Sequence, residues 1–415
     1  MLHRWIAAVH TDAARQALSD PLRPGNLERP QPECPRAMRH PLRVTGPVLL
    51  ACCLAACAGD PGPPQGITPY APSPAMAAVL QERQAMRAAD PGTLSIARAR
   101  EVPNLIGAMQ AIPNVRGLPA DSPDLPVVRA LTASGIDGPL PARLYQSPIA
   151  RNTPLIIYFP GGTWVTGGTD DYDESARQLA RRTGWVVVAI GTRHAPEATF
   201  PAIHDDAFAA YQWARSHARE WGADPTRIAL AGEGPGANLA LSTALLARDR
   251  RTPEPDHLLL ITPLAGTTLS GPSMDDSGRS LPLTRRTVAW AQQRYTTDDR
   301  QLQDPRLDLA SRPDLAGMPP TTIILAEIDP LRSGGEALAA RLSAAGVPTG
   351  LRLFPGTTHD FFGLGEQVPE AAAAEDYAAA RLKAAFASAD LPALRPRGAV
   401  RHRPARRAHR PVMGS

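Results

Sequence analysis

The chain has few cysteines and almost no lysine, and the apolar run near its N-terminus is short. Four cysteines occur among 415 residues, at positions 34, 52, 53 and 57, and Lys383 is the only lysine. Because every cysteine lies before residue 58, the body of the chain can form no disulfide and has no thiol nucleophile. The apolar run over residues 48–56 is too short for a bilayer-spanning helix, which needs roughly 20 residues.

Residues 38–57 are arranged like a secretory signal. Met38 begins a short basic stretch with Arg39 and Arg43, which the apolar run and then Cys57 follow. The junction Leu-Ala-Ala-Cys at 54–57 resembles a bacterial lipobox, where the cysteine becomes lipidated. The resemblance implies a membrane anchor on Cys57 and, since alanine follows, an outer-membrane lipoprotein that faces the periplasm. A plain cleaved signal, which would give a soluble periplasmic or secreted protein, and a chance apolar run are the alternatives.

The basic charge belongs to the two ends of the chain. Residues 1–57 carry seven arginines and four acidic residues, and residues 391–415 carry seven arginines and no acidic residue. The remainder has 30 basic and 36 acidic residues, which gives it a net charge near −6 although the whole chain is +4. The overall charge therefore says little about the partners of the folded part.

We expect both ends to lie outside the fold. Residues 1–37 precede a credible start at Met38 and are interpreted as an over-extended gene start. Residues 58–73 are dense in proline and glycine and predict a tether. Residues 389–415 predict a disordered, arginine-rich tail. Such a tail is either simply solvated or contacts anionic envelope polymers, and nucleic acid is not an expected partner of an exported protein.

Residues 74–388 show the alternation that is typical of an α/β protein. We expect a first helix over 74–89, with Val79, Leu80 and Met86 buried, and an antiparallel pair of strands over 127–133 and 142–146. Further apolar runs then alternate with helical stretches, which favours a mostly parallel sheet with helices on both faces and chemistry at the carboxyl ends of its strands. The expected strands are 155–159, 185–190, 227–231, 257–261, 321–326 and 351–354, and the expected helices are 204–219, 237–248, 334–345 and 370–387.

Two glycine-rich segments follow expected strands. Gly161 and Gly162 lie in Phe-Pro-Gly-Gly-Thr-Trp over 159–164. Closely spaced glycines let backbone N–H groups approach a developing oxyanion, although a tight turn would also explain them. Residues 232–236 read Gly-Glu-Gly-Pro-Gly, which has the spacing of a G-x-S-x-G nucleophile elbow without its serine. Gly234 stands at the serine position, and Pro235 has no N–H to give to an oxyanion.

Two residues with catalytic chemistry follow the last two expected strands. Asp329 lies in Glu-Ile-Asp-Pro-Leu-Arg over 327–332, and His359 lies in Thr-His-Asp-Phe-Phe over 358–362. An aspartate can orient an imidazole and stabilise its charged form. A further segment over 192–206 contains Thr-Arg-His-Ala-Pro-Glu, Phe-Pro-Ala and Asp-Asp.

These segments, in this order, resemble the motifs of the hormone-sensitive-lipase-like carboxylesterases: H-G-G-G, Y-R-L-A-P-E, G-D-S-A-G-G-N, D-P-L-R-D and H-G-F. The resemblance covers about residues 74–388 and implies the α/β-hydrolase fold, with a helical cap from about 74–118 and 264–302. It also implies that Asp329 and His359 are the acid and base of a triad and that the oxyanion donors are Gly162 and Thr163. Residues 192–206, including His194, then have an architectural role.

The elbow departs from the family pattern at four positions. They are Glu233, Gly234, Pro235 and Ala237, between the elbow glycines Gly232 and Gly236 and Asn238. Glu233 stands where the family has a structural aspartate, so we expect no chemical role for it. Loss of the serine costs on the order of 10⁶ in turnover, and loss of one oxyanion donor costs ~10²-fold or more.

Two interpretations of function follow. The first is a pseudo-esterase of the cell envelope that binds a small acyl or ester-like ligand, or a protein partner. The second is an active hydrolase of reactive carboxylic esters, in which the Asp329/His359 dyad activates water. The sequence contains no phosphate loop, metal-ligand cluster or dinucleotide fingerprint, so we expect no cofactor and no metal.

Overall fold

The structure is a computed structural model that describes residues 70–112, 126–146 and 150–389. All of these residues belong to the unit Pro63–Ser415. The predictions for the gene start, the lipoprotein signal with Cys57, residues 58–69 of the tether and all but the first residue of the tail lie outside the described residues. Within the described part, no helix is both long and apolar enough to cross a membrane.

Eight strands form one sheet in the order β1-β2-β4-β3-β5-β6-β7-β8. β2 is antiparallel to both β1 and β4, and the pairs from β4 to β8 are parallel. The mostly parallel sheet is therefore confirmed, and so is the antiparallel pair at its edge. The strands are β1 Val127–Gly135, β2 Gly138–Gln146, β3 Thr153–Phe159, β4 Val186–Ile190, β5 Ala223–Glu233, β6 His257–Ile261, β7 Thr321–Ile328 and β8 Thr349–Thr358.

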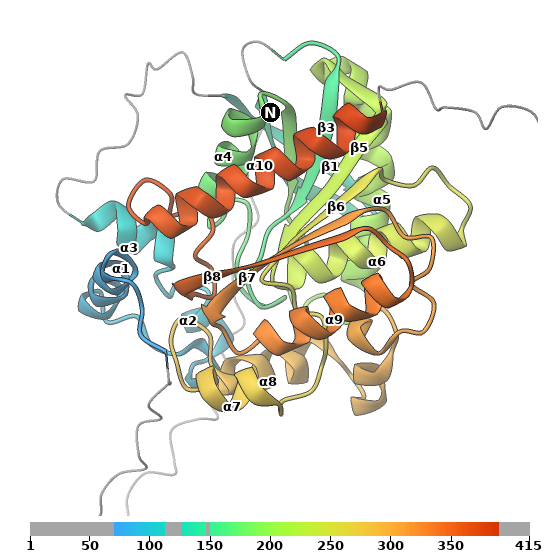
Figure 1. Ribbon diagram of the computed structural model, residues 1–415. Coiled ribbons are helices and arrows are strands. Elements are labelled where there is room, and N and C mark those ends of the chain that lie inside the picture. The colour runs from blue at the N-terminus through green and yellow to red at the C-terminus, as the bar shows by residue number, and fades with distance from the viewer. Residues whose placement is uncertain (1–69, 113–125, 147–149, 390–415) are drawn as a thin grey trace, which may run out of the picture. The chain divides into compact units, whose positions relative to one another are not determined.

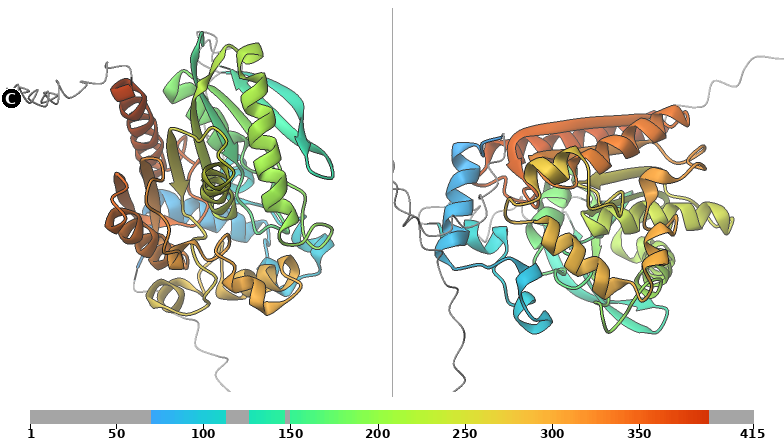
Figure 2. Two further views of the ribbon diagram at one scale, coloured as in Figure 1. Left: turned by 90° about the vertical axis from the view of Figure 1, so that its right-hand side faces the viewer. Right: turned by 90° about the horizontal axis from the view of Figure 1, so that it is seen from below.

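Helices cover both faces of the sheet. One face packs on α5, α6 and α9, and the other packs on α4 and α10 with α1 and α3. In Figure 1, α10 crosses in front of the strands, and the left view of Figure 2 shows α10 and α5 on opposite sides of them. The helices are α1 Pro74–Ala85, α2 Ile96–Ala99, α3 Leu105–Ala111, α4 Asp173–Thr183, α5 Ala202–His217, α6 Pro235–Asp249, α7 Pro272–Ser277, α8 Arg285–Tyr295, α9 Arg332–Ala344 and α10 Pro369–Ala389, and the 3-10 turns are η1 Pro91–Thr93, η2 Ala218–Trp221, η3 Asp299–Gln303 and η4 Leu309–Ser311.

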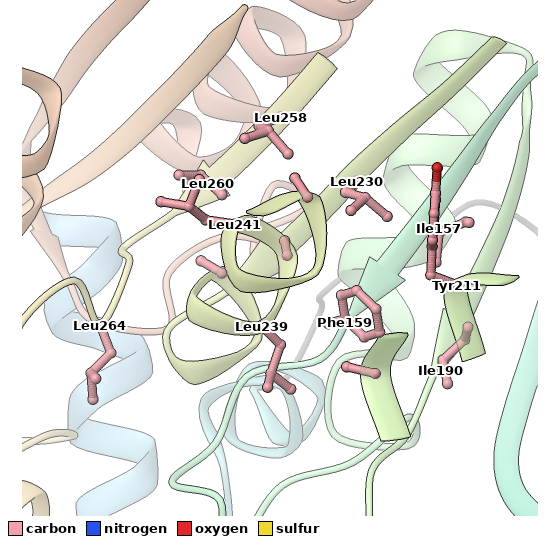
Figure 3. Packing of buried hydrophobic residues seen from close by; sticks show 14 of the residues in the cluster. Ile157, Phe159, Ile190, Tyr211, Leu230, Leu239, Leu241, Leu258, Leu260 and Leu264 are labelled. Atoms are coloured by element: carbon pink, nitrogen blue, oxygen red, sulfur yellow. The ribbon is translucent and has the colours of Figure 1, made fainter. Parts of the chain in front are cut away.

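The central strands are apolar along their whole length because both of their faces are buried. Alternate residues of each strand point to opposite faces, so Leu258 and Leu260 of β6 belong to one core and Leu259 to the other. Figure 3 shows Leu230, Leu258 and Leu260 gathered around α6, which carries Leu241. Helix α6 begins at Pro235, two residues after the end of β5, and this packing holds the helix against the sheet there.

Two details of the helices differ from the prediction. The first helix ends at Ala85 rather than at residue 89, because Arg87 has a φ of 56° that no α-helix allows, and Met86 is 38% exposed. Helix α4 was not predicted at all, because its buried apolar residues are mainly small. Its acidic first turn, its basic last turn and the left-handed Gly184 after it are nevertheless standard helix signals.

The helical segments α1 to α3 and the insert with α7 and α8 lie near the arrowhead ends of β7 and β8 (Figure 1). The two groups are joined by Asp90, whose carboxylate accepts hydrogen bonds from Thr284 at 2.8 Å and from Thr287. They therefore meet over the carboxyl ends of the strands, where catalytic chemistry was expected.

Candidate active site

Residue 234 occupies a sharp turn between β5 and α6. Gly234 has φ 50° and ψ −119°, a conformation that side chains disfavour strongly. Its N–H donates to the carbonyl of Ile261 at 2.9 Å, and its own carbonyl accepts the N–H of Leu264 at 3.0 Å. These bonds tie the turn to β6 and to the loop after it, so the backbone of the elbow is held on both sides.

The two flanking glycines are required by close backbone approach. A Cβ on Gly232 would lie 2.3 Å from the carbonyl oxygen of Gly236, and a Cβ on Gly236 would lie 2.1 Å from the carbonyl oxygen of Phe159. Both distances are far below van der Waals contact. The sequence pattern G-x-G-x-G is thus explained by geometry at its first and last positions.

Asp329 and His359 are brought together by the pairing of β7 with β8. Ile328 pairs with Thr358, and the two catalytic candidates are the residues that follow. Nδ1 of His359 lies 2.9 Å from Oδ2 of Asp329, and both side chains are buried. The other carboxylate oxygen of Asp329 accepts the N–H of Leu331 at 2.8 Å, which fixes its orientation.

Gly234 lies directly beside the free edge of this imidazole. A Cβ on Gly234 would be 3.4 Å from Nε2 of His359. A side chain at position 234 would therefore reach the nitrogen that a general base uses. The structure brings together the elbow, the base and the acid.

The loop after β3 completes the site only in part. Gly162 has a φ of 112°, and a Cβ on it would lie 2.0 Å from the carbonyl oxygen of Thr166. Its N–H has no hydrogen-bond partner among the described residues. Thr163 is different from the prediction, because its N–H donates to the carbonyl of Thr166 at 3.1 Å and closes the loop instead of pointing to a ligand. Gly161 leaves room for Tyr172, whose hydroxyl oxygen would be 2.5 Å from an added Cβ.

A small cavity of about 90 Å³ lies at this site. Gly162, Thr163 and His359 line it from the sheet, and Arg83 and Leu283 are among the residues that line it from the helical segments. Both segments predicted to form a cap thus contribute residues to the cavity lining. Residues 113–118 of the first segment lie outside the described residues.

A comparison with known proteins agrees with this geometry. The model of the family described as alpha/beta hydrolase fold matches residues 156–363. The chain belongs to this family. Its relatives confirm the predicted group of carboxylesterases, and the chain covers 65% and 81% of the two curated relatives described next.

Two curated relatives and two solved structures illustrate the similarity. The carboxylic ester hydrolase LipN of Mycobacterium tuberculosis is 37% identical over 57% of this chain and 65% of LipN. The carboxylesterase NlhH of the same species is 37% identical over 61% of this chain and 81% of NlhH. The hyperthermophilic esterase of Pyrobaculum calidifontis has a TM-score of 0.68 at 30% identity, covering 76% of this chain and 99% of that one. The ester hydrolase EH1AB1 from the Lake Arreo metagenome has a TM-score of 0.68 at 29% identity, with the same coverage.

Within this alpha/beta hydrolase, Asp360 alters the environment of the base. Its φ is 60°, its Oδ1 accepts the hydroxyl of Tyr172 at 2.7 Å, and the same oxygen lies 3.5 Å from Nε2 of His359. Burial lowers the pKa of His359, but Asp329 and Asp360 outweigh burial and raise it to about 9. The imidazole is therefore protonated at neutral pH, and a protonated imidazole cannot accept a proton as a base.

Asp360 was not among the site residues predicted from the sequence. The signal was present, because the residue after the family's histidine is glycine in H-G-F and aspartate here. A positive φ explains why glycine suits that position, and aspartate is one of the few other residues that tolerates it.

The remaining candidates lie where the architectural interpretation places them. His194 is hydrogen-bonded to the carbonyl of Gly167 at 2.6 Å, and Asn238 donates to the carbonyls of Leu264 and Leu307. Glu233 is fully buried, with its carboxyl accepting the hydroxyl of Tyr158 at 2.6 Å. Burial raises the pKa of Glu233 to about 8, so its carboxyl is mostly protonated at neutral pH.

Proposed function

We propose that this protein is a catalytically impaired carboxylesterase that binds a small acyl or ester-like ligand without turning it over. The observation that carries the proposal is the absence of any side chain at residue 234, although a Cβ there would lie 3.4 Å from Nε2 of His359. The turn, the base and its acid are those of a serine hydrolase. The nucleophilic serine that the base would activate is absent, because residue 234 is glycine.

Charge stabilisation at the site is also weak. Pro235, the first residue of α6, has no N–H, and the N–H of Thr163 is used within its own loop. Of the three donors that the family pattern provides, only the N–H of Gly162 can face an acyl oxygen. Because preorganised donors contribute most of the stabilisation of a tetrahedral intermediate, this site supports binding better than reaction.

The second candidate function is hydrolysis by the Asp329/His359 dyad acting on water. The 2.9 Å contact between the two side chains favours it. The raised pKa of His359 counts against it at neutral pH, since a protonated imidazole has no lone pair for a water proton. The dyad would also need an oxyanion site that only Gly162 supports. We therefore favour binding.

Binding without turnover is the expected result with a simple ester. The purified full chain should give a saturable heat signal in calorimetric titration with ethyl acetate, while chromatography of the same mixture should detect no acetate above the rate in buffer. His359→Ala should leave that background unchanged. Hydrolysis that disappears in His359→Ala would instead support the dyad, and absence of binding by both ethyl acetate and a short ester that carries a charge would contradict a ligand role.

We further propose that the protein is anchored in the cell envelope through Cys57 and faces the periplasm, with its arginine-rich tail near anionic polymers. The order of charge, apolar run and lipobox in the sequence supports this. Cys57→Ala should move the protein from the membrane fraction to the soluble fraction of bacterial cells that express it. Cys53→Ala is the matched control and should leave the distribution unchanged, and an unchanged distribution of Cys57→Ala would contradict the anchor.

A further inference from the structure

Arg83 is a buried cation in the cavity wall. It lies in the last turn of α1 and is 4% exposed. Its Nε donates to the carbonyl of Pro103 at 3.1 Å, and within the described ranges neither terminal amino group has a hydrogen-bond partner. No carboxylate of the described chain lies within ion-pair distance of it, yet its side chain lines the cavity together with His359.

The other charged groups of the lining already have partners. Arg100 pairs with Glu197 at 2.6 Å. His359 pairs with Asp329 at one nitrogen and approaches Asp360 at the other. Among the described residues that line the cavity, Arg83 is thus the cation that lacks a carboxylate.

Two carboxylates attract the charge of Arg83 from beyond ion-pair distance, and both accept hydrogen bonds from other groups. They belong to Asp360 and Asp90. Asp360 accepts the hydroxyl of Tyr172, and Asp90 accepts the N–H of Gly92 at 2.8 Å in addition to the two threonines of the insert. Asp171, also in the lining, accepts the side chain of Asn104 at 3.0 Å. None of these groups neutralises the guanidinium directly.

A side chain that is 4% exposed has lost most of its hydration, and the guanidinium of Arg83 has no carboxylate within the described ranges to offset that loss, so an anion bound there would be stabilised. Guanidinium groups bind carboxylates with two parallel hydrogen bonds, and the terminal amino groups of Arg83 are the pair that such a contact uses. The carboxylates of Asp171 and Asp360 repel an anion elsewhere in the cavity. The other two cations of the lining, Arg100 and the protonated His359, already face carboxylates of the chain, so Arg83 is the most favourable position for a ligand carboxylate.

We propose that the ligand of this cavity is a short acyl compound that carries a carboxylate, with the carboxylate on Arg83 and the acyl group directed to Gly162 and His359. The inference rests on the proposed function, because it places the ligand in the same cavity. The cavity volume of about 90 Å³ favours a short ligand over a long-chain one. A half ester of a short dicarboxylic acid has this chemistry.

The test compares two probes of equal shape and different charge. Monomethyl malonate carries the carboxylate, and methyl malonamate replaces it with a neutral amide. Calorimetric titration of the full chain should show the half ester bound roughly 10- to 100-fold more tightly, the range expected for a hydrogen bond to a charged group. Equal affinities, or no binding of the half ester at millimolar concentration, would overturn the proposal.

Substitutions at Arg83 test whether this residue causes the tighter binding of the half ester. Arg83→Met should abolish the difference between the probes, and Arg83→Lys should reduce it. Arg87→Met, at an exposed arginine just beyond the same helix, is the control and should preserve it. If Arg83 served only to hold Pro103, Arg83→Met would lower the urea midpoint of unfolding and leave the preference intact. We expect an equal or higher midpoint without ligand, because an unpaired buried charge is removed.

These outcomes separate this inference from the proposed function. Equal binding of both probes without release of methanol would overturn the carboxylate site and leave the impaired esterase standing. Release of methanol that depends on His359 would overturn the impaired esterase, and a surviving charge preference would still support the role of Arg83. Should Arg83→Met fail to fold, Arg83→Lys and the two probes on the unmodified chain decide the matter.

Discussion

Replacing Gly234 with serine, Pro235 with alanine and Asp360 with asparagine in one chain is expected to restore hydrolysis of short-chain esters, at a rate roughly 10²-fold or more above that of Gly234→Ser alone. The serine alone should restore little. Its hydroxyl would reach His359, since a Cβ at this position lies 3.4 Å from Nε2. The reaction would still lack an oxyanion donor and a neutral base.

Each added substitution supplies one missing function. Pro235→Ala returns an N–H at the start of α6, and one such donor is worth about 10²–10³ in turnover. Asp360→Asn removes the charge beside Nε2 while keeping an acceptor for the hydroxyl of Tyr172, and asparagine tolerates the positive φ. Each unit by which the pKa of His359 falls towards neutrality gives about tenfold more free base at pH 7.

Turnover of p-nitrophenyl acetate by the single, double and triple variants measures these steps. The serine itself should lower the free energy of unfolding by about 1–3 kcal/mol, because a side chain is strained at this φ and ψ. Rates are therefore compared at a temperature where urea titration shows all variants folded. Equal rates for Gly234→Ser and Gly234→Ser/Pro235→Ala would contradict the role given to Pro235. His359→Ala added to the triple variant should abolish the gain.

Stability is expected to fall as pH rises from 6.5 to 9. The pKa of His359 is raised from 6.5 in the unfolded chain to about 9 in the folded chain. A raised histidine pKa means that the folded state binds the proton more tightly, so its contribution is complete below pH 6.5 and is lost as pH rises through about 9. The loss is on the order of 3 kcal/mol, at about 1.4 kcal/mol for each pKa unit.

Glu233 also makes stability fall as pH rises, but over a lower pH range than His359 does. Its carboxyl keeps its proton in the folded state up to about pH 8, whereas the unfolded chain loses it near 4.5. Stability is therefore lost between these two values, because folding must then hold a proton that the unfolded chain has released. Glu375 contributes similarly up to about pH 7.

Urea unfolding from pH 5 to 9.5 separates these groups. Asp329→Asn/His359→Gln replaces the buried ion pair by neutral residues of similar shape, and this double variant should lose the part of the dependence that extends from pH 8 to 9. Glu233→Gln should keep that part and lose only the share of the lower-pH dependence that Glu233 contributes, while the share from Glu375 remains. If the stability of the double variant followed that of the unmodified protein up to pH 9, His359 would not be protonated in the folded state.

The sheet and the dyad could be predicted from the sequence because their signals are local. Apolar runs such as residues 257–261 mark strands that are buried on both faces, and His257–Ile261 is indeed β6. Asp329 and His359 each follow such a run, and the ends of neighbouring parallel strands meet at one edge. The elbow glycines could be recognised by their spacing.

The charges around the site could not be predicted, because they depend on contacts between distant segments. Arg83 comes to the cavity through the packing of α1, some 276 residues before His359 in the chain. The hydrogen bond from the N–H of Thr163 to Thr166 depends on the conformation of the loop rather than on its composition. The sequence marks Asp360 as a departure from H-G-F, but its approach to Nε2 depends on the packing against Tyr172.

The central claim is that the unmodified protein keeps the site of an esterase and does not use it for hydrolysis. The most direct measurement is the rate of p-nitrophenol release from p-nitrophenyl acetate by the full chain and by His359→Ala, side by side at pH 7. We expect equal rates, both at the level of the uncatalysed reaction. A rate for the full chain well above that level, abolished by His359→Ala, would contradict it.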